Sequence, residues 1–173
     1  MLYRNPMVNA ILNKSGYTRI GNGLYSDVYA RGTEPFVIKV SNDTQNWPTY
    51  IQWANECGYA GGFAPMVYRY QLYDGFFIAV MERFEWMLAR HPIDDVDNFF
   101  HQAWTHLEPR FPGLNEFMAH ACHDLNIGDL HGGNIMLNAD ATRICLIDPS
   151  SRPRPRTLPR RFRSATSIMR GLR

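Results

Sequence analysis

The chain has 173 residues, 45% of them apolar and 13% aromatic, which is enough for one domain with a hydrophobic core and argues against wholesale disorder. No apolar run approaches the roughly 20 residues of a membrane span, and residues 1–9 are too polar for a secretory signal. The three cysteines are scattered without a CxxC pair, which argues against a disulfide framework or a zinc site, so we expect a reduced, cytoplasmic protein without membrane association.

The net charge of +2 conceals an asymmetry. Residues 152–173 hold eight arginines and no acidic residue, whereas the remainder of the chain carries a charge of −6. Three prolines and like-charge repulsion predict that this basic tail is extended from Arg152 to about Pro159. It is either a solvated tail that packs on the acidic body or an arm that docks on an acidic partner or nucleic acid. The near absence of aromatic residues disfavours nucleic acid.

The first half of the chain predicts a five-stranded, mostly antiparallel sheet with one inserted helix. A tight turn at Gly21-Asn22-Gly23, where glycine or asparagine can take positive φ, joins the first two strands. Pro48 suits the first turn of a helix that reaches about Tyr59, and Asp74-Gly75 predicts a hairpin between the last two strands. The expected strands are Tyr17–Ile20, Leu24–Arg31, Phe36–Val40, Met66–Tyr73 and Phe76–Glu82.

After Arg83 the pattern of apolar residues becomes helical. Helical spacing runs through residues 94–107 and 114–125, and two short strands follow at 135–137 and 144–147. We therefore predict an α+β fold. A minimal domain spans residues 1–151, with an N-terminal lobe of about 1–83 and a reduced, mainly helical C-terminal lobe of about 84–151, and the basic tail of residues 152–173 follows.

Two features of the predicted sheet indicate a phosphate site. The pattern Gly21-x-Gly23-x-x-Ser26 is typical of a loop whose main-chain N–H groups approach anionic oxygens, although a plain hairpin turn also explains it. Lys39 lies on the next strand, where a buried ammonium group needs a phosphate and a counter-charge; the alternative is an edge-strand lysine that points to water. Glu56, in the predicted helix, can supply that charge, so we expect a Lys39–Glu56 ion pair.

The segment from Ile127 to Asp148 carries the strongest chemical signal. Asp129 and Asn134 lie five residues apart on a glycine-containing loop, and Asp148 ends the next apolar strand. One carboxylate can orient an attacking hydroxyl, while an amide and a second carboxylate hold Mg²⁺ against phosphates. We expect Asn134 and Asp148 to converge on one metal site.

In this order, the residues resemble the protein-kinase superfamily, whose signature is a glycine-rich loop, a strand lysine, HRDxxxxN and DFG. The resemblance implies a two-lobed protein-kinase-like fold that uses ATP and Mg²⁺. It implies that Asp129 is the catalytic aspartate, that Lys39 contacts the α- and β-phosphates, and that Asn134 and Asp148 bind the metal. The remaining nucleotide-binding residues that it implies are Gly21, Asn22 and Gly23 in the phosphate loop, Val28 and Met136 around adenine, Glu56 as the helix partner of Lys39, and Glu82 and Phe84 at the hinge.

Residues 128–135 are similar to aminoglycoside and choline kinases, which carry the counterpart of His131 where most protein kinases have lysine; His131 is thus a further candidate catalytic residue. Across about Tyr17–Ser150 the chain more closely resembles the early serine/threonine protein kinases of short-tailed lytic coliphages. The motifs are residues 20–29, 37–40 and 129–136 and the pair Asp148-Pro149. This resemblance implies a bacteriophage enzyme in the host cytoplasm that phosphorylates host proteins, including transcription and translation machinery.

The chain also departs from the protein-kinase pattern. Asp148 is followed by Pro149-Ser150 in place of Phe-Gly, and the 25 residues after Asp148 are too few for an activation loop and a peptide-binding platform. We therefore expect no regulation through an activation loop. Two alternatives to a protein kinase stay open: a small-molecule phosphotransferase of the aminoglycoside-kinase type, and a kinase-shaped binding protein that inhibits a host factor.

Overall fold

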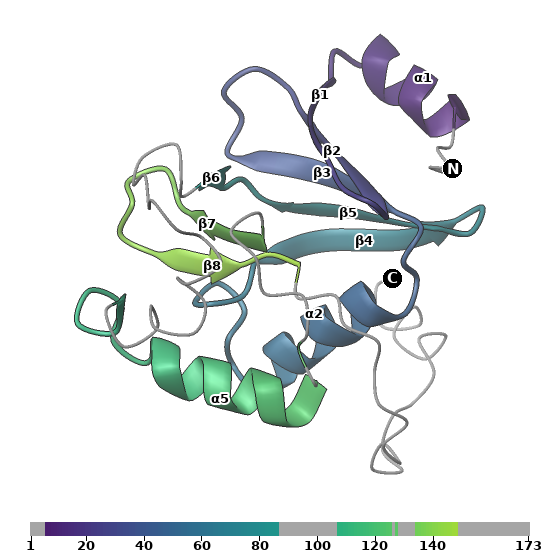
Figure 1. Cartoon of the computed structure of the whole chain (residues 1–173). Helices are drawn as coiled ribbons and strands as arrows, with labels where there is room; N and C mark the ends of the chain where they lie inside the picture. The colour runs from purple at the N-terminus through teal and green to yellow at the C-terminus, as the bar shows by residue number, and fades with distance from the viewer. Residues whose placement is uncertain (1–5, 87–106, 126, 128–133, 149–173) are drawn as a thin grey trace.

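The computed structural model describes residues 6–86, 107–125, 127 and 134–148. It has an α+β fold, as predicted, in which a five-stranded antiparallel sheet of strand order β1-β2-β3-β5-β4 accompanies a three-stranded sheet, β6-β7-β8 (Figure 1). The elements are α1 (Pro6–Lys14), β1 (Thr18–Asn22), β2 (Ser26–Ala30), β3 (Phe36–Ser41), α2 (Asn46–Glu56), β4 (Val67–Tyr73), β5 (Phe76–Glu82), β6 (Glu85–Trp86), α5 (Leu114–Leu125), β7 (Ile135–Leu137) and β8 (Ile144–Leu146).

The large sheet follows the sequence signals closely. All five predicted strands form, and the predicted helix lies between β3 and β4. Asp74 and Gly75 adopt φ values of 50° and 75°, as a two-residue hairpin turn of type I′ requires. In the register of the sheet, Lys39 of β3 lies opposite Val28 of β2 and Ala79 of β5.

The turn between β1 and β2 differs from the prediction. Strand β1 extends through Asn22, so the connection comprises residues 23–25, and neither Gly21 nor Gly23 adopts positive φ. A register shift between Arg19 and Gly21 gives the hairpin an irregularity. This irregularity lies within β1, before the residues that connect it to β2.

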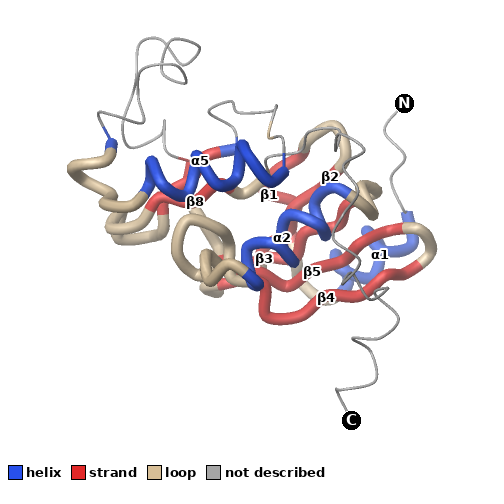
Figure 2. Tube along the Cα trace, turned by 90° about the horizontal axis from the view of Figure 1, so that it is seen from below, coloured by secondary structure: helices blue, strands red, loops and turns tan. Residues whose placement is uncertain are grey.

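Different helices cover the two faces of the large sheet. On one face, which we call the outer face, Val8 and Leu12 of α1 pack with Tyr29, Val40 and Phe76 of the sheet. On the inner face lies the main core, to which α2, α5 and the small sheet contribute. Seen from below, α2 crosses in front of β3, β5 and β4, and α5 runs beside β8 (Figure 2). Lys39, on the inner face of β3, accordingly contacts Trp47 of α2 and Asp148, which follows β8.

The described part of the C-terminal lobe contains α5 and the small sheet. Helix α5 has the predicted bounds, and β7 and β8 form where short strands are expected. The apolar residues of the predicted 94–107 helix lie mainly outside the described residues, as does the basic tail at 152–173. The elements α1 and β6 were not anticipated. None of the helices in the described part of the chain has the length and hydropathy of a membrane span.

Candidate active site

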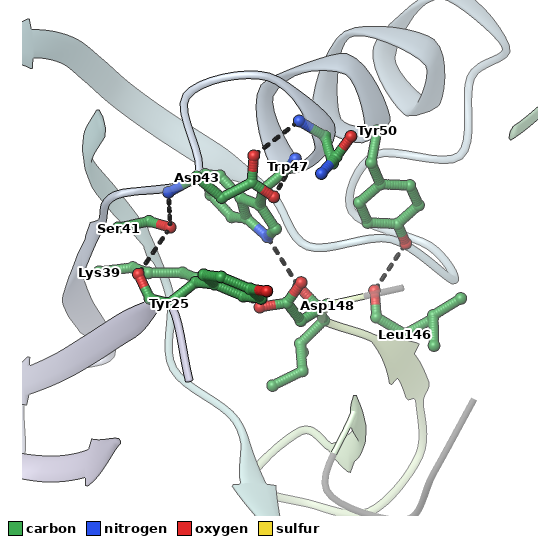
Figure 3. Close-up of polar contacts among 10 residues, drawn as sticks. Tyr25, Lys39, Ser41, Asp43, Trp47, Tyr50, Leu146 and Asp148 are labelled. Atoms are coloured by element: carbon green, nitrogen blue, oxygen red, sulfur yellow. Dashed lines mark hydrogen bonds and ion pairs between the residues drawn. The ribbon is translucent and has the colours of Figure 1, made fainter. Parts of the chain in front are cut away.

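Lys39 is buried on the inner face of the large sheet, with 4% of its surface exposed. Strand alternation directs its side chain toward β8, where Nζ lies 2.7 Å from Oδ2 of Asp148 (Figure 3). Burial lowers the pKa of the Lys39 ammonium, and the carboxylate of Asp148 opposes that shift. A buried ammonium group is tolerated when it is paired in this way, so the alternative of a solvated edge-strand lysine is excluded.

Asp148 follows strand β8 and keeps one carboxylate oxygen available. Oδ2 accepts the hydrogen bond from Lys39, whereas Oδ1 is buried and has no hydrogen-bond partner among the described residues. A buried carboxylate oxygen without a partner carries an unfavourable desolvation energy that a bound cation would offset. This oxygen is therefore a suitable Mg²⁺ ligand.

Asn134 lies at the same end of the small sheet as Asp148. Ile135 pairs with Leu146, and the N–H of Ile147 donates to the carbonyl of Asn134 at 2.8 Å. The antiparallel ladder thus brings Asn134 beside the residue that precedes Asp148, and 8% of its surface is exposed. An amide and a carboxylate at one strand end fit the oxygen ligands of Mg²⁺. The described residues contain no group of three acidic, histidine or cysteine residues that could hold a metal.

The predicted Lys39–Glu56 ion pair is wrong. Glu56 is exposed at the last position of α2, and its Oε1 accepts a hydrogen bond from Gln52 at 2.9 Å. Helix α2 begins at Asn46, so the residue next to Lys39 is Trp47 of its first turn. Glu56 lies nine positions after Trp47, which places it roughly 13 Å further along the helix axis.

Aromatic residues of α2 take the place of the missing acid. The Nε1–H of Trp47 donates to the carbonyl of Ile147 at 2.9 Å, and the hydroxyl of Tyr50 donates to the carbonyl of Leu146 at 2.6 Å (Figure 3). The ammonium of Lys39 lies 4.4 Å from the centroid of the Trp47 ring. Burial raises the pKa of Tyr50 well above its ordinary value, so its hydroxyl remains a donor. The helix is thereby attached to the strand that leads into Asp148.

Asp43 caps the N-terminus of α2. Its Oδ1 accepts hydrogen bonds from the N–H groups of Gln45 and Asn46 at 3.1 and 2.8 Å, and its Oδ2 accepts one from Trp47 at 3.3 Å. A carboxylate here satisfies N–H groups that have no partner within the helix and interacts favourably with the helix dipole. The N–H of Asp43 donates to the hydroxyl oxygen of Ser41, which continues the network toward β3.

The predicted phosphate loop is tethered to this network. The carbonyl of Tyr25 accepts hydrogen bonds from the N–H of Asn42 at 2.9 Å and from the hydroxyl of Ser41 at 3.2 Å. At Gly21 and Gly23 an added Cβ would meet its nearest neighbours at 3.7 and 3.6 Å, which are ordinary van der Waals distances. The fold itself therefore has room for side chains at both positions, and the N–H of Gly23 donates to the carbonyl of Ser26 at 2.7 Å.

The residues expected around adenine lie in two groups. Val28 and Met136 are both partly buried and pack against the main core from β2 and β7. Glu82 ends β5, where its side chain forms an ion pair with Arg143, and the ring of Phe84 is buried with the Arg143 guanidinium 5.4 Å from its centroid. These side chains are therefore engaged within the protein, and the main-chain N–H groups of Glu82 and Arg83 donate to the carbonyls of Met66 and Pro35. Asn22 lies in β1, opposite Asp27.

Two catalytic candidates, Asp129 and His131, lie outside the described residues. Conversely, sequence reasoning overlooked Trp47, Tyr50, Asp43 and Arg143. The three-residue spacing of Trp47, Tyr50 and Trp53 was the available signal, because it places three aromatic residues with polar atoms on one helix face. Asp43, three residues before the first residue of α2, was a recognisable capping candidate.

No family model and no curated protein matches the sequence. Among solved structures, the chain is similar to Rad53 in complex with AMP-PNP, with a TM-score of 0.49, 12% identity and coverage of 84% of this chain and 43% of that chain. It is also similar to the PknI kinase domain of Mycobacterium tuberculosis, with a TM-score of 0.40, 20% identity and coverage of 80% and 62%. This chain thus spans less than two thirds of either structure.

Proposed function

We propose that this protein is an ATP-dependent phosphotransferase with a protein-kinase-like fold. The observation that carries the proposal is the Lys39–Asp148 pair, in which a buried strand lysine meets a carboxylate whose second, buried oxygen has no hydrogen-bond partner among the described residues. Lys39 lies on the third strand, after a glycine-containing loop, and a helix and two strands follow. Kinases place their phosphate-binding lysine in this order of elements.

Each residue of the proposed site has one task. Asn134 and Asp148 would hold Mg²⁺, which when bound neutralises charge on the phosphates. Lys39 contacts the phosphates of ATP from the β3 side, and Gly21 and Gly23 allow the β1–β2 loop to approach them. Asp129 orients the acceptor hydroxyl and accepts its proton as the oxygen attacks the γ-phosphorus and ADP leaves.

We further propose that the acceptors are serine and threonine hydroxyls of host proteins, as in a bacteriophage protein kinase. The motifs of residues 20–29, 37–40 and 129–136 support this assignment. The eight arginines of residues 152–173 give the chain a basic segment suited to acidic protein surfaces. The Gly128–Ile135 motif favours a second candidate, a small-molecule phosphotransferase.

The test is phosphate transfer from labelled ATP. The purified chain is incubated with Mg²⁺ and either bacterial lysate or an aminoglycoside, beside Asp129→Ala and a matched Asp140→Ala control in the exposed β7–β8 turn. Labelled protein bands with the wild type and Asp140→Ala, but not with Asp129→Ala, are the expected result. Label on the aminoglycoside alone would identify the second candidate. Absence of transfer in both arms would contradict the proposed function.

A further inference from the structure

Trp47 connects helix α2 to both Lys39 and the segment that leads to Asp148. Its side chain is 1% exposed, its indole N–H donates to Ile147 at 2.9 Å, and its ring lies 4.4 Å from the Lys39 ammonium (Figure 3). The ring of Phe77, from β5, meets it edge-on with centroids 5.3 Å apart. One residue thus contacts both the lysine of β3 and Ile147, the residue before Asp148, and packing against Phe77 fixes its ring.

Neither of the acids on or beside α2, Glu56 and Asp43, contacts the Lys39 ammonium in the way that Trp47 does. Glu56 is exposed and bonded to Gln52, and the carboxylate of Asp43 accepts three N–H groups at the start of α2. Asp148 is the acid within ion-pair distance of Lys39 in the described part of the chain. From the helix side, the group presented to the ammonium is therefore an aromatic face.

We propose that Trp47 is a positioning residue for phosphate binding, which holds the Lys39 ammonium through its ring where a helix carboxylate was expected. This inference rests on the proposed function. It assigns Trp47 a specific role: to set the affinity for the phosphates of ATP through Lys39.

The physical argument concerns charge. A carboxylate partner would hold Lys39 by a full charge and add negative charge near the site that receives phosphates. An aromatic face attracts an ammonium through its quadrupole, and tryptophan does so best, with the attraction strongest where water is excluded. The ring therefore holds the lysine without a direct ion pair from the helix side, where the carboxylate of Asp43 adds only a weaker electrostatic attraction. Loss of the ring should weaken ATP binding in particular, because Lys39 would no longer be held toward the phosphates.

Trp53 provides a matched control on the same helix. Its indole N–H donates to Oδ2 of Asp124 at 2.8 Å, and 8% of its surface is exposed. Its aromatic contacts are with Tyr50, Tyr59 and Phe117, on the side of α2 that faces α5. Replacement of Trp53 therefore removes an indole and its hydrogen bond from α2 without removing the ring beside Lys39.

The test compares a ligand with phosphates and one without. Dissociation constants for Mg·ATP and for adenosine are measured by calorimetry, or by ligand-observed NMR where binding is weak, on the wild type, Trp47→Leu, Trp47→Phe and Trp53→Leu. Trp47→Leu should raise the Mg·ATP constant about 30-fold and leave the adenosine constant within about twofold. Trp47→Phe keeps an aromatic face and should give an intermediate loss. Trp53→Leu should leave both constants within about twofold.

The outcomes separate the two proposals. A wild-type chain that binds no Mg·ATP contradicts the proposed function. A wild-type chain that binds it, with Trp47→Leu binding equally well, overturns the role of Trp47 alone. An equal loss of ATP and adenosine binding in Trp47→Leu would show a structural effect and would also overturn the inference. If Trp47→Leu does not fold, the same comparison on Trp47→Phe decides: an ATP-selective loss supports the inference, and an unchanged or equal response for both ligands rejects it.

Discussion

Trp47 and Trp53 lie toward opposite ends of helix α2, and each indole N–H donates to a segment of the C-terminal lobe. At the N-terminal end, the acceptor is the main-chain carbonyl of Ile147 and the ring faces the buried Lys39. At the C-terminal end, the acceptor is the side chain of Asp124, which is 44% exposed.

The difference separates two kinds of attachment. The N-terminal end of α2 is joined to the residues proposed to bind phosphate and metal, so a change there should alter ligand binding. The C-terminal end is joined to α5, away from Lys39, so a change there should alter the stability of the fold. The same residue type and the same kind of hydrogen bond thus have different consequences because their neighbours differ.

Lys39→Met at the N-terminal end should have the largest effect. It removes the positive charge proposed to contact the phosphates and leaves the carboxylate of Asp148 unpaired. We expect kcat to fall about 100- to 1,000-fold, in line with the loss of one electrostatic contact to a transition state. Steady-state phosphate transfer checks this, with Lys14→Met on the exposed end of α1 as the control. Equal activity of the two variants would contradict it.

Asp43→Ala should destabilise the N-terminal end of α2, although Asp43 is not one of the residues proposed to contact ATP. Three N–H groups lose their acceptor, so the free energy of unfolding should drop by about 1–2 kcal/mol. Asp43→Asn keeps a capping oxygen and should recover most of that loss. Urea denaturation measures both variants, and equal stability of Asp43→Ala and the wild type would show that the cap does not contribute.

Asp124 at the C-terminal end makes a pH-dependent contribution to stability. Hydrogen bonds from His123 and Trp53 lower the pKa of its carboxyl below the ordinary value of 3.8. A carboxyl with a lowered pKa stabilises the fold above its unfolded-state pKa and loses that contribution as the pH falls through its folded-state pKa. Asp124→Asn should therefore be less stable than the wild type from pH 7 to about pH 4, and the gap should narrow below that. Urea titrations across this range would contradict the account if the gap were constant.

Glu56→Gln should have the smallest effect of all. The side chain is exposed and distant from Lys39, and glutamine can still accept the hydrogen bond from Gln52. We expect unchanged Mg·ATP affinity and a change in unfolding free energy within about 0.5 kcal/mol. A loss of affinity similar to that of Lys39→Met would restore Glu56 as the partner of Lys39.

The sheet could be predicted because its signals are local. β-Branched runs specify the strands, and Asp74-Gly75 specifies a hairpin turn whose positive φ values few other pairs accept. The sequence also identifies Lys39 and Asp148 as site residues, because Lys39 is a charged residue within a short apolar strand and Asp148 follows another. What the sequence could not settle was which acid reaches Lys39, because the two residues of the pair are 109 positions apart.

The error over Glu56 concerns the place of this residue at the far end of α2, roughly 13 Å along the helix axis from Trp47. Pro48 predicts a later start for α2, whereas the helix begins at Asn46, and the carboxylate of Asp43 accepts hydrogen bonds from the N–H groups of Gln45, Asn46 and Trp47. Even with the right start, the expectation of an acidic partner favoured Glu56 over an aromatic residue. The spacing of Trp47, Tyr50 and Trp53 indicates which face of α2 packs on the rest of the protein. Their hydrogen-bond acceptors could not be predicted, because these are two main-chain carbonyls and an aspartate that lie near α2 only in the folded chain.

The most direct test of the central claim, that Asp148 and Lys39 form a site for Mg·ATP, is a calorimetric titration with ATP in the presence and absence of Mg²⁺. Wild type and Asp140→Asn should both bind ATP in a Mg²⁺-dependent manner. Among the described residues, the side chain of Asp140 accepts hydrogen bonds only from Thr142 in its own turn, so its replacement should not alter the site. Asp148→Asn should lose at least about tenfold in affinity with Mg²⁺ and show no Mg²⁺ dependence, since it lacks the charged oxygen that the cation requires. Mg²⁺-dependent binding of Asp148→Asn at wild-type affinity would contradict the account.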